Sequence, residues 1–102
     1  MARFDVHRPT FHAPAPLVVN VQADLLSALA TRAVIPLAPY DGAAPEALQR
    51  LKPVLRLGHE RYVLVTADLT VMHVSEISEP VANLEDQRTT IIDAIDFLLQ
   101  GF

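Results

Sequence analysis

The segment NLEDQRTTIIDAIDFLLQGF, residues 83–102, carries the clearest structural signal in the chain. Its large apolar residues recur at about the 3.6-residue period of an α-helix. Asn83 is a favourable N-cap residue, and the acidic residues that follow it suit the positive end of a helix dipole. The pattern therefore predicts a helix over about residues 83–102. Its core-facing stripe is expected to contain Leu84, Ile91, Ile92, Ile95, Leu98, Leu99 and Phe102.

The chain before this helix shows the patterns of β-strands. Residues 4–6, 17–22, 54–57, 61–66 and 69–77 are each predicted to form a strand, with Leu17, Val19 and Val21 on one face. The sequence Gly58-His59-Glu60 between two of these strands predicts a hairpin. Pro36 cannot donate a ladder hydrogen bond, so residues 33–37 are expected to form an edge strand or a strand end.

Three connecting segments have weaker patterns. Residues 8–16, RPTFHAPAP, contain three prolines and are expected to form a loop or a hairpin tip. Residues 24–32 suit either a short helix or an irregular connection, and residues 43–51 suit a helical turn or two. Several antiparallel strands followed by one long helix indicate an α+β fold that is mostly β, or a small barrel with a packed helix. The length of 102 residues indicates a single domain, 1–102.

The composition excludes several classes of protein. There is no cysteine, which rules out a disulfide scaffold, a thiolate zinc site and a cysteine nucleophile, and which fits a reducing cytoplasm. The N-terminal sequence lacks the apolar run of a signal peptide. The longest apolar runs fall short of the about 20 residues that span a bilayer. The formal net charge of −4 argues against a direct nucleic-acid surface. We therefore expect a cytoplasmic protein that contacts neither membrane nor nucleic acid on its own.

The sequence shows no catalytic or metal-binding motif. None of the four histidines has the spacing of a zinc site, no phosphate-binding glycine loop is present, and no serine lies in a nucleophile elbow. Asp93 and Asp96 are read as the solvated face of the helix or, alternatively, as an acid–base pair. Phe97 lies off the apolar stripe, either as a lone exposed aromatic residue or as a partner contact. The sequence thus predicts no catalytic residue, no metal and no cofactor, and it favours protein–protein interaction.

Five segments, in their order and spacing, indicate a family. None of the five segments is specific alone, but together they cover the chain almost from end to end. In these segments the chain resembles the CcdB family, the toxins of toxin–antitoxin pairs. The segments are FDVH near the start, VVNVQADLL at 18–26, RAVIPLA at 32–38, KPVLRLGHERYVLVTADL at 52–69 and VSEISEPVANLEDQRTTIIDAIDFLLQGF at 74–102.

The resemblance implies a fold, partners and a mode of action. The implied fold is a small SH3-like barrel with a long C-terminal helix, assembled as a symmetric homodimer. The implied function is that of a non-catalytic toxin whose helix tips bind the A subunit of DNA gyrase and trap the gyrase–DNA cleavage complex. A cognate CcdA-like antitoxin with a disordered segment is expected to neutralise it. Operator DNA is expected to be reached only through that antitoxin.

The resemblance also assigns residues by position. The gyrase-binding group would be Leu25, Leu26, Asp96, Leu99, Gln100, Gly101 and Phe102. Phe97 and Leu98 would lie at the dimer interface, and the loop at Arg8, Pro9, Thr10, Phe11 and His12 would contact the antitoxin. For Leu25 and Leu26, packing in the core is the alternative interpretation.

One position departs from the family pattern. The poisoning toxins of the family carry a tryptophan immediately before the final glycine, where it is expected to stack on an arginine of gyrase, and this chain has Gln100 there. Two alternative functions follow. One is an endoribonuclease toxin, resembling an mRNA interferase, on the same barrel, in which Arg61 or His59 would be required for RNA cleavage. The other is a degenerate toxin that retains only antitoxin binding.

Overall fold

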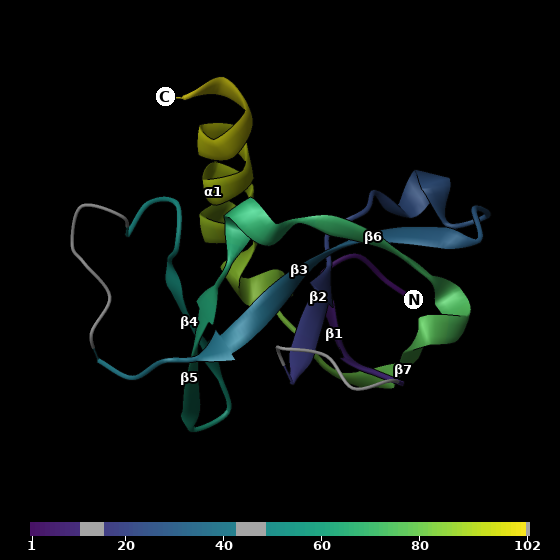
Figure 1. Ribbon diagram of the computed structural model, residues 1–102, viewed down its shortest axis with the longest axis horizontal. Coiled ribbons are helices and arrows are strands. Elements are labelled where there is room, and N and C mark those ends of the chain that lie inside the picture. The colour runs from purple at the N-terminus through teal and green to yellow at the C-terminus, as the bar shows by residue number, and fades with distance from the viewer. Residues whose placement is uncertain (11–15, 43–48, 102) are drawn as a thin grey trace.

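The computed structural model describes residues 1–10, 16–42 and 49–101. All strands in these ranges join one curled antiparallel sheet, with a C-terminal helix at its side (Figure 1). The strand order is β4-β5-β3-β2-β1-β7, and β6 pairs with β3. This architecture confirms the prediction of a mostly β, barrel-like fold with a C-terminal helix. The elements are β1 (Asp5–Pro9), β2 (Leu17–Asn20), β3 (Thr31–Pro39), β4 (Val54–Leu57), β5 (Glu60–Leu64), β6 (Thr70–His73), β7 (Ile77–Asn83) and α1 (Arg88–Gln100).

Strand β3 lies at the centre of the sheet and residues 33–37 are its middle, so the prediction of an edge strand or a strand end there is wrong. It pairs with β2 along one side, and with β6 and then β5 along the other. The carbonyl of Pro36 accepts a hydrogen bond from Val65 N at 3.0 Å, just after the end of β5. The nitrogen of Pro36 faces the same side, between the last β6 pair at Val34 and the first β5 pair at Leu37. No backbone N–H is required from β3 between these two pairings, so a central strand tolerates proline at this position.

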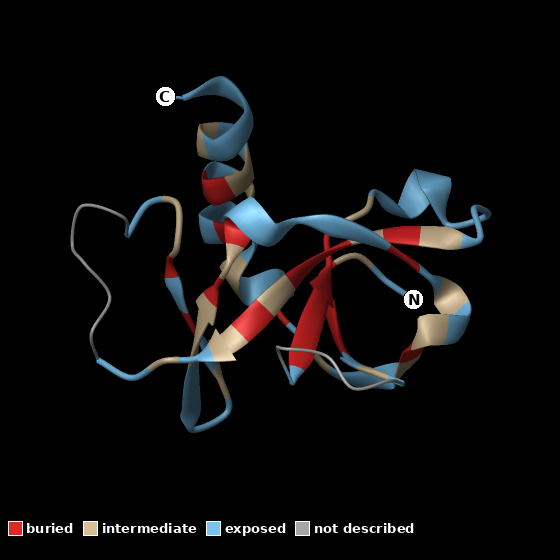
Figure 2. Cartoon of the chain, in the orientation of Figure 1, coloured by how far each residue is buried: buried red, intermediate tan, exposed pale blue. Residues whose placement is uncertain are grey.

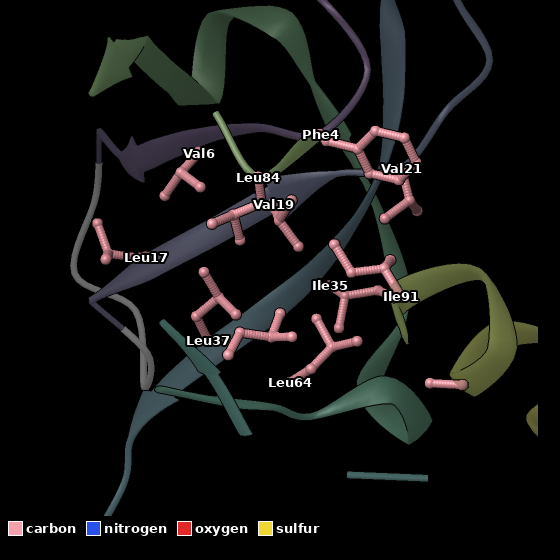
Figure 3. Close-up of a cluster of buried hydrophobic side chains, with 12 residues drawn as sticks. Phe4, Val6, Leu17, Val19, Val21, Ile35, Leu37, Leu64, Leu84 and Ile91 are labelled. Carbon is pink, nitrogen blue, oxygen red and sulfur yellow. The ribbon is translucent and has the colours of Figure 1, made fainter. Parts of the chain in front are cut away.

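The two faces of the sheet bury separate apolar clusters. The larger cluster packs against α1, as the close-up of its side chains shows (Figure 3). Leu17, Val19 and Val21 all belong to it, which confirms the prediction that they share a face. The smaller cluster contains Val18, Val34, Met72 and Ile77. The buried members of the larger cluster are Phe4, Val6, Leu17, Val19, Val21, Ile35, Leu37, Leu55, Leu64, Leu84, Ile91 and Ala94.

The C-terminal helix begins later than its sequence pattern predicts. Residues Glu85–Gln87 form a 3₁₀ turn, and the α-helix follows from Arg88 to Gln100. Asn83 ends β7, and its side-chain oxygen accepts a hydrogen bond from Glu85 N at 2.7 Å. Asn83 therefore forms an Asx turn that leads into the 3₁₀ turn, and it does not cap α1. Phe102 lies outside the described residues.

The single strand predicted over residues 69–77 is two strands with a turn between them. Strand β6 ends at His73, a 3₁₀ turn spans Val74–Glu76, and β7 begins at Ile77. The His73 ring nitrogen accepts from Ser75 N, and the Glu76 carboxylate accepts from His73 N, so a reciprocal capping box closes the N-terminal end of this turn. Strand β7 pairs with β1 at the edge of the sheet, where Pro80 is tolerated, and the sequence pattern missed it.

The remaining local predictions have mixed outcomes. The hairpin is confirmed, because β4 and β5 pair around Gly58 and His59, and Gly58 has a φ of +64°, as the first loop residue of a type II′ turn requires. Residues 24–30 form an irregular connection with one 3₁₀ turn, Asp24–Leu26, and the last two residues of the predicted segment 24–32 already belong to β3. The prediction for residues 43–51 falls largely outside the described residues. The N-terminal part of the predicted 8–16 loop extends β1 to Pro9.

The outer edge of β4 is covered by a side chain that imitates a neighbouring strand. Gln87 Oε1 accepts a hydrogen bond from Arg56 N at 2.9 Å, and Gln87 Nε2 donates to Arg56 O at 2.7 Å. One amide thus satisfies both backbone groups of an edge residue. Because unpaired strand edges promote association with other chains, this contact protects the edge and also fixes the start of α1 to the β4–β5 hairpin.

Replacing Gln87 with alanine is expected to lower the free energy of unfolding by about 1–2 kcal/mol, because two hydrogen bonds are lost. The loss should also increase aggregation, since Arg56 then exposes its backbone N–H and C=O. Urea denaturation and light scattering measure the two effects. Gln49→Ala, at an exposed glutamine, is the matched control and should leave both unchanged. Equal stability of the Gln87 variant and the wild type would contradict this role.

Candidate partner-binding surface at the tip of the C-terminal helix

The C-terminal half of α1 projects from the body of the molecule. Ile91 and Ala94 are its buried residues, and Ile92 and Ile95 pack partly against the core. After Ile95 no described residue of the helix is buried, and Figure 2 shows the last turns as mostly exposed. The apolar stripe expected to be buried along the whole helix therefore ends about half-way, and the outer residues are free for a partner.

The tip combines exposed apolar side chains with negative charge. Leu99 is 73% exposed and Leu98 36% exposed, which corrects the expectation that they face the core. Asp96 and Gln100 are exposed beside them. Gly101 ends the helix in the left-handed conformation with a φ of +78°, and its N–H donates to Phe97 O at 2.8 Å.

No basic residue lies in the last turn of α1 to offset the negative end of its dipole. Asp96 adds a full negative charge there. The tip is therefore an exposed apolar surface with an electronegative rim, and its chemistry suits a partner that presents cations around an apolar contact.

Phe97 is covered from within its own chain. The guanidinium of Arg50 lies 4.7 Å from the centroid of the Phe97 ring, and it forms a two-point ion pair with Asp93 at 3.0 and 3.1 Å. Phe97 is thus half-buried rather than a lone exposed aromatic residue. Asp93 is the ion-pair partner of Arg50, so its carboxylate is not one half of an acid–base pair with Asp96.

Leu25 and Leu26 form a second exposed apolar site. They lie in the 3₁₀ turn Asp24–Leu26 and are 93% and 49% exposed, so the alternative of core packing is wrong. Figure 1 places this blue turn on the opposite side of the view from the yellow end of α1. Within one chain, the structure therefore separates these two leucines from Asp96, Leu99, Gln100 and Gly101.

Arg32 holds the connection that carries Leu25 and Leu26. Its buried guanidinium donates to the carbonyls of Ser27 and Thr31, each at 2.8 Å, and to the carbonyl of Leu29. Three backbone oxygens thus fix the segment around one cation. Arg32 is consequently engaged in structure and is not available as a catalytic arginine.

The proposed antitoxin loop lies partly within the described residues. Arg8 N donates to Ser78 Oγ at 3.2 Å, and Thr10 N donates to Glu76 O at 2.8 Å, so this end of β1 is attached to β7 and the turn before it. Pro9 pairs with Ile77 in the same ladder. Phe11 and His12 lie outside the described residues.

The other candidates for chemistry are dispersed. His59 and Arg61 are exposed on the β4–β5 hairpin, whereas His73 is bound to Ser75 through its Nδ1 at 2.8 Å. Within residues 1–10, 16–42 and 49–101, no three histidine or acidic side chains gather as a metal site. None of the helices in those ranges is long and apolar enough to cross a membrane.

Sequence reasoning missed two residues that shape this surface, Arg50 and Gln87. Each acts on a distant partner: Arg50 is 43 residues from Asp93, and Gln87 is 31 residues from Arg56. No local sequence pattern predicts such pairs. Only the position of Asp93 and Phe97 four residues apart, on one helix face, indicates that a single long side chain can contact both.

The structure is that of a small, mostly β, barrel-like protein with a projecting C-terminal helix. The family model for the CcdB protein matches residues 3–101. The chain therefore belongs to the CcdB family, the non-enzymatic gyrase poisons of toxin–antitoxin systems, whose partners are gyrase and the CcdA antitoxin. This membership excludes the endoribonuclease alternative.

Proposed function

We propose that this chain is a toxin that binds the A subunit of DNA gyrase through the tip of α1 and traps the gyrase–DNA cleavage complex. The observation that carries the proposal is the projecting tip, with Leu99 largely exposed and Asp96 beside it. Large exposed apolar side chains at the end of a helix have no role in the stability of the monomer. Such side chains contribute favourable free energy to binding when a partner removes their apolar surface from water.

The electronegative rim of the tip supports a cationic binding site on gyrase. The last carbonyl groups of α1 and the carboxylate of Asp96 attract positive side chains. Gln100 can exchange hydrogen bonds with such a site, but it cannot stack on a guanidinium as the family tryptophan would. The tip of this chain therefore engages gyrase through apolar contacts and hydrogen bonds, with Leu25 and Leu26 as a further proposed contact.

A homodimer in the cytoplasm is part of the proposal, with Phe97 and Leu98 near the dimer interface. Two copies of the chain present two tips to the dimeric gyrase A subunit, and simultaneous engagement raises the overall affinity. A CcdA-like antitoxin reverses the inhibition, and the exposed end of β1 with the residues that follow it is the candidate contact.

A cleavage assay with purified gyrase tests the proposal. Incubation of the protein with gyrase, ATP and supercoiled plasmid, followed by detergent and protease, is expected to yield linear DNA in proportion to the protein added. A chain that ends at Leu98 retains the buried part of α1 and is the negative control. A folded dimer that produces no linear DNA, and that does not stop growth when expressed alone, would instead indicate a degenerate toxin that retains only antitoxin binding.

A further inference from the structure

The direction of the α1 tip is not determined by the hydrophobic core alone. The core holds the helix at Ile91 and Ala94, and the side chains beyond Ile95 extend past it. A helix rises about 1.5 Å per residue, so the segment from Ala94 to Gln100 extends about 9 Å past the last buried residue. A small change in the helix axis would therefore displace the tip.

Two side-chain contacts attach α1 to the β4–β5 hairpin. The first is the pair of hydrogen bonds between Gln87 and the backbone of Arg56, at the start of the helix. The second is Arg50, which lies just before β4 and contacts Asp93 and Phe97. These attachments are separated by about two to three turns of the helix, so together they constrain the direction of its axis.

Arg50 uses the full geometry of its guanidinium. The Nε and Nη2 atoms bind the two carboxylate oxygens of Asp93 at 3.0 and 3.1 Å, while the Cζ atom lies 4.7 Å from the ring centroid of Phe97. Hydrogen bonds to Asp93 raise the pKa of Arg50 above its ordinary value, with a smaller lowering from desolvation and further raising by the charges of Asp93 and Asp96. Lysine has no planar fork and cannot make both contacts in the same way.

Arg50 lies just before the β4–β5 hairpin, whose strands are held together by backbone hydrogen bonds. Pro53, three residues after Arg50, accepts a hydrogen bond from Leu64 N at 3.0 Å, and β4 is paired with β5 along its length. Leu55 and Leu64 are buried in the core. The turn that carries Arg50 therefore leads, three residues later, into a segment that backbone hydrogen bonds attach to β5.

We propose that Arg50 is a positioning residue, which fixes the direction of the α1 tip relative to the sheet and thereby the fit of Leu99 and Gln100 to their partner. The proposal rests on the proposed binding of gyrase by that tip. The ion pair is exposed, with side-chain exposures of 45% for Arg50 and 50% for Asp93, so its contribution to folding stability is small. Its larger effect is on the order of the helix end.

Arg50→Ala is the test. We expect affinity for the purified gyrase A subunit, measured by calorimetry, to fall about three- to tenfold, because the binding reaction must then order the tip. In the free protein, ¹⁵N order parameters of residues 96–101 should fall while those of β3 stay unchanged. Arg61→Ala, which removes one positive charge at an exposed position of the β4–β5 hairpin, is the control and should change neither measurement.

The double variant Arg50→Asp/Asp93→Arg separates positioning from direct contact with gyrase. It restores the ion pair and places an arginine four residues before Phe97, so affinity and order parameters should recover.

Unchanged order parameters in Arg50→Ala would overturn the proposal, and that measurement needs no gyrase. If the wild type fails to bind gyrase, the proposed function is wrong. The ¹⁵N order parameters of the free protein then still test whether Arg50 orders the tip. Loss of affinity without recovery in the double variant would also overturn the proposal, because it would assign Arg50 to the gyrase contact.

Discussion

Replacing Phe4 with alanine is expected to lower the free energy of unfolding by about 3–5 kcal/mol, a large part of the about 5–15 kcal/mol that stabilises a typical domain. The Phe4 ring is 1% exposed and lies in the main core next to Val21 (Figure 3). The guanidinium of Arg3 lies 4.9 Å from its centroid and that of Arg88 lies 6.0 Å away. Alanine would leave a cavity and remove both cation–π contacts.

The backbone of Phe4 explains why the ring matters so much. Its φ of +69° is in the left-handed region, which costs about 1–2 kcal/mol for a residue with a side chain. In this conformation Phe4 N donates to Asn20 O at 2.6 Å, and Phe4 O accepts from Leu84 N at 2.9 Å. The residue thus joins β2 to the chain that leads into α1. Burial of the ring offsets the backbone strain, and alanine would keep the strain without that compensation.

Urea denaturation followed by circular dichroism, at one fixed protein concentration because the protein is expected to dimerise, measures this effect. Phe4→Leu retains most of the apolar volume and should lose clearly less stability than Phe4→Ala. Val71→Ala, at a side chain that is 62% exposed, should stay within about 0.5 kcal/mol of the wild type. A loss below about 1 kcal/mol in Phe4→Ala would show that the ring is not a central support of the core.

Elements with strong local signals were predictable from the sequence. The apolar period of the last segment predicts α1, and the glycine between two strand patterns predicts the β4–β5 hairpin, because both structures form between residues that are close in the chain. Periodicity cannot show where a helix leaves the body of the protein. Leu98 and Leu99 continue the stripe of Ile91 and Ile95, yet they extend past the core, so their exposure appears only in three dimensions.

Elements that depend on distant partners were not predictable. Pro36 is acceptable in a central strand only because it lies between the residues of β3 that pair with β6, up to Val34, and those that pair with β5, from Leu37. Strand β7 contains a proline, and it forms because β1, more than 60 residues earlier in the chain, supplies its ladder. The candidate tip came from family resemblance, while Arg50, which orders the tip, has no local signature. Long-range pairing therefore accounts for most of what the sequence left open.

Gln100→Trp is expected to strengthen binding to the gyrase A subunit by about two- to 30-fold, the equivalent of about 0.5–2 kcal/mol for a ring placed on a guanidinium. Gln100 is the last residue of α1 and is exposed. A larger side chain at this position therefore needs no repacking of the core, and folding stability should be unchanged.

The gain should come from stacking rather than from added apolar area alone, and two variants distinguish these sources. Gln100→Leu adds apolar surface without a planar ring, so in calorimetry it should gain less affinity than Gln100→Trp. The chain contains no other tryptophan, so the indole fluorescence of Gln100→Trp reports directly on the tip and should shift when gyrase binds. An equal gain in both variants would contradict stacking. No gain in either, combined with unchanged fluorescence, would show that Gln100 lies outside the contact and that this chain reaches gyrase through other residues of the tip.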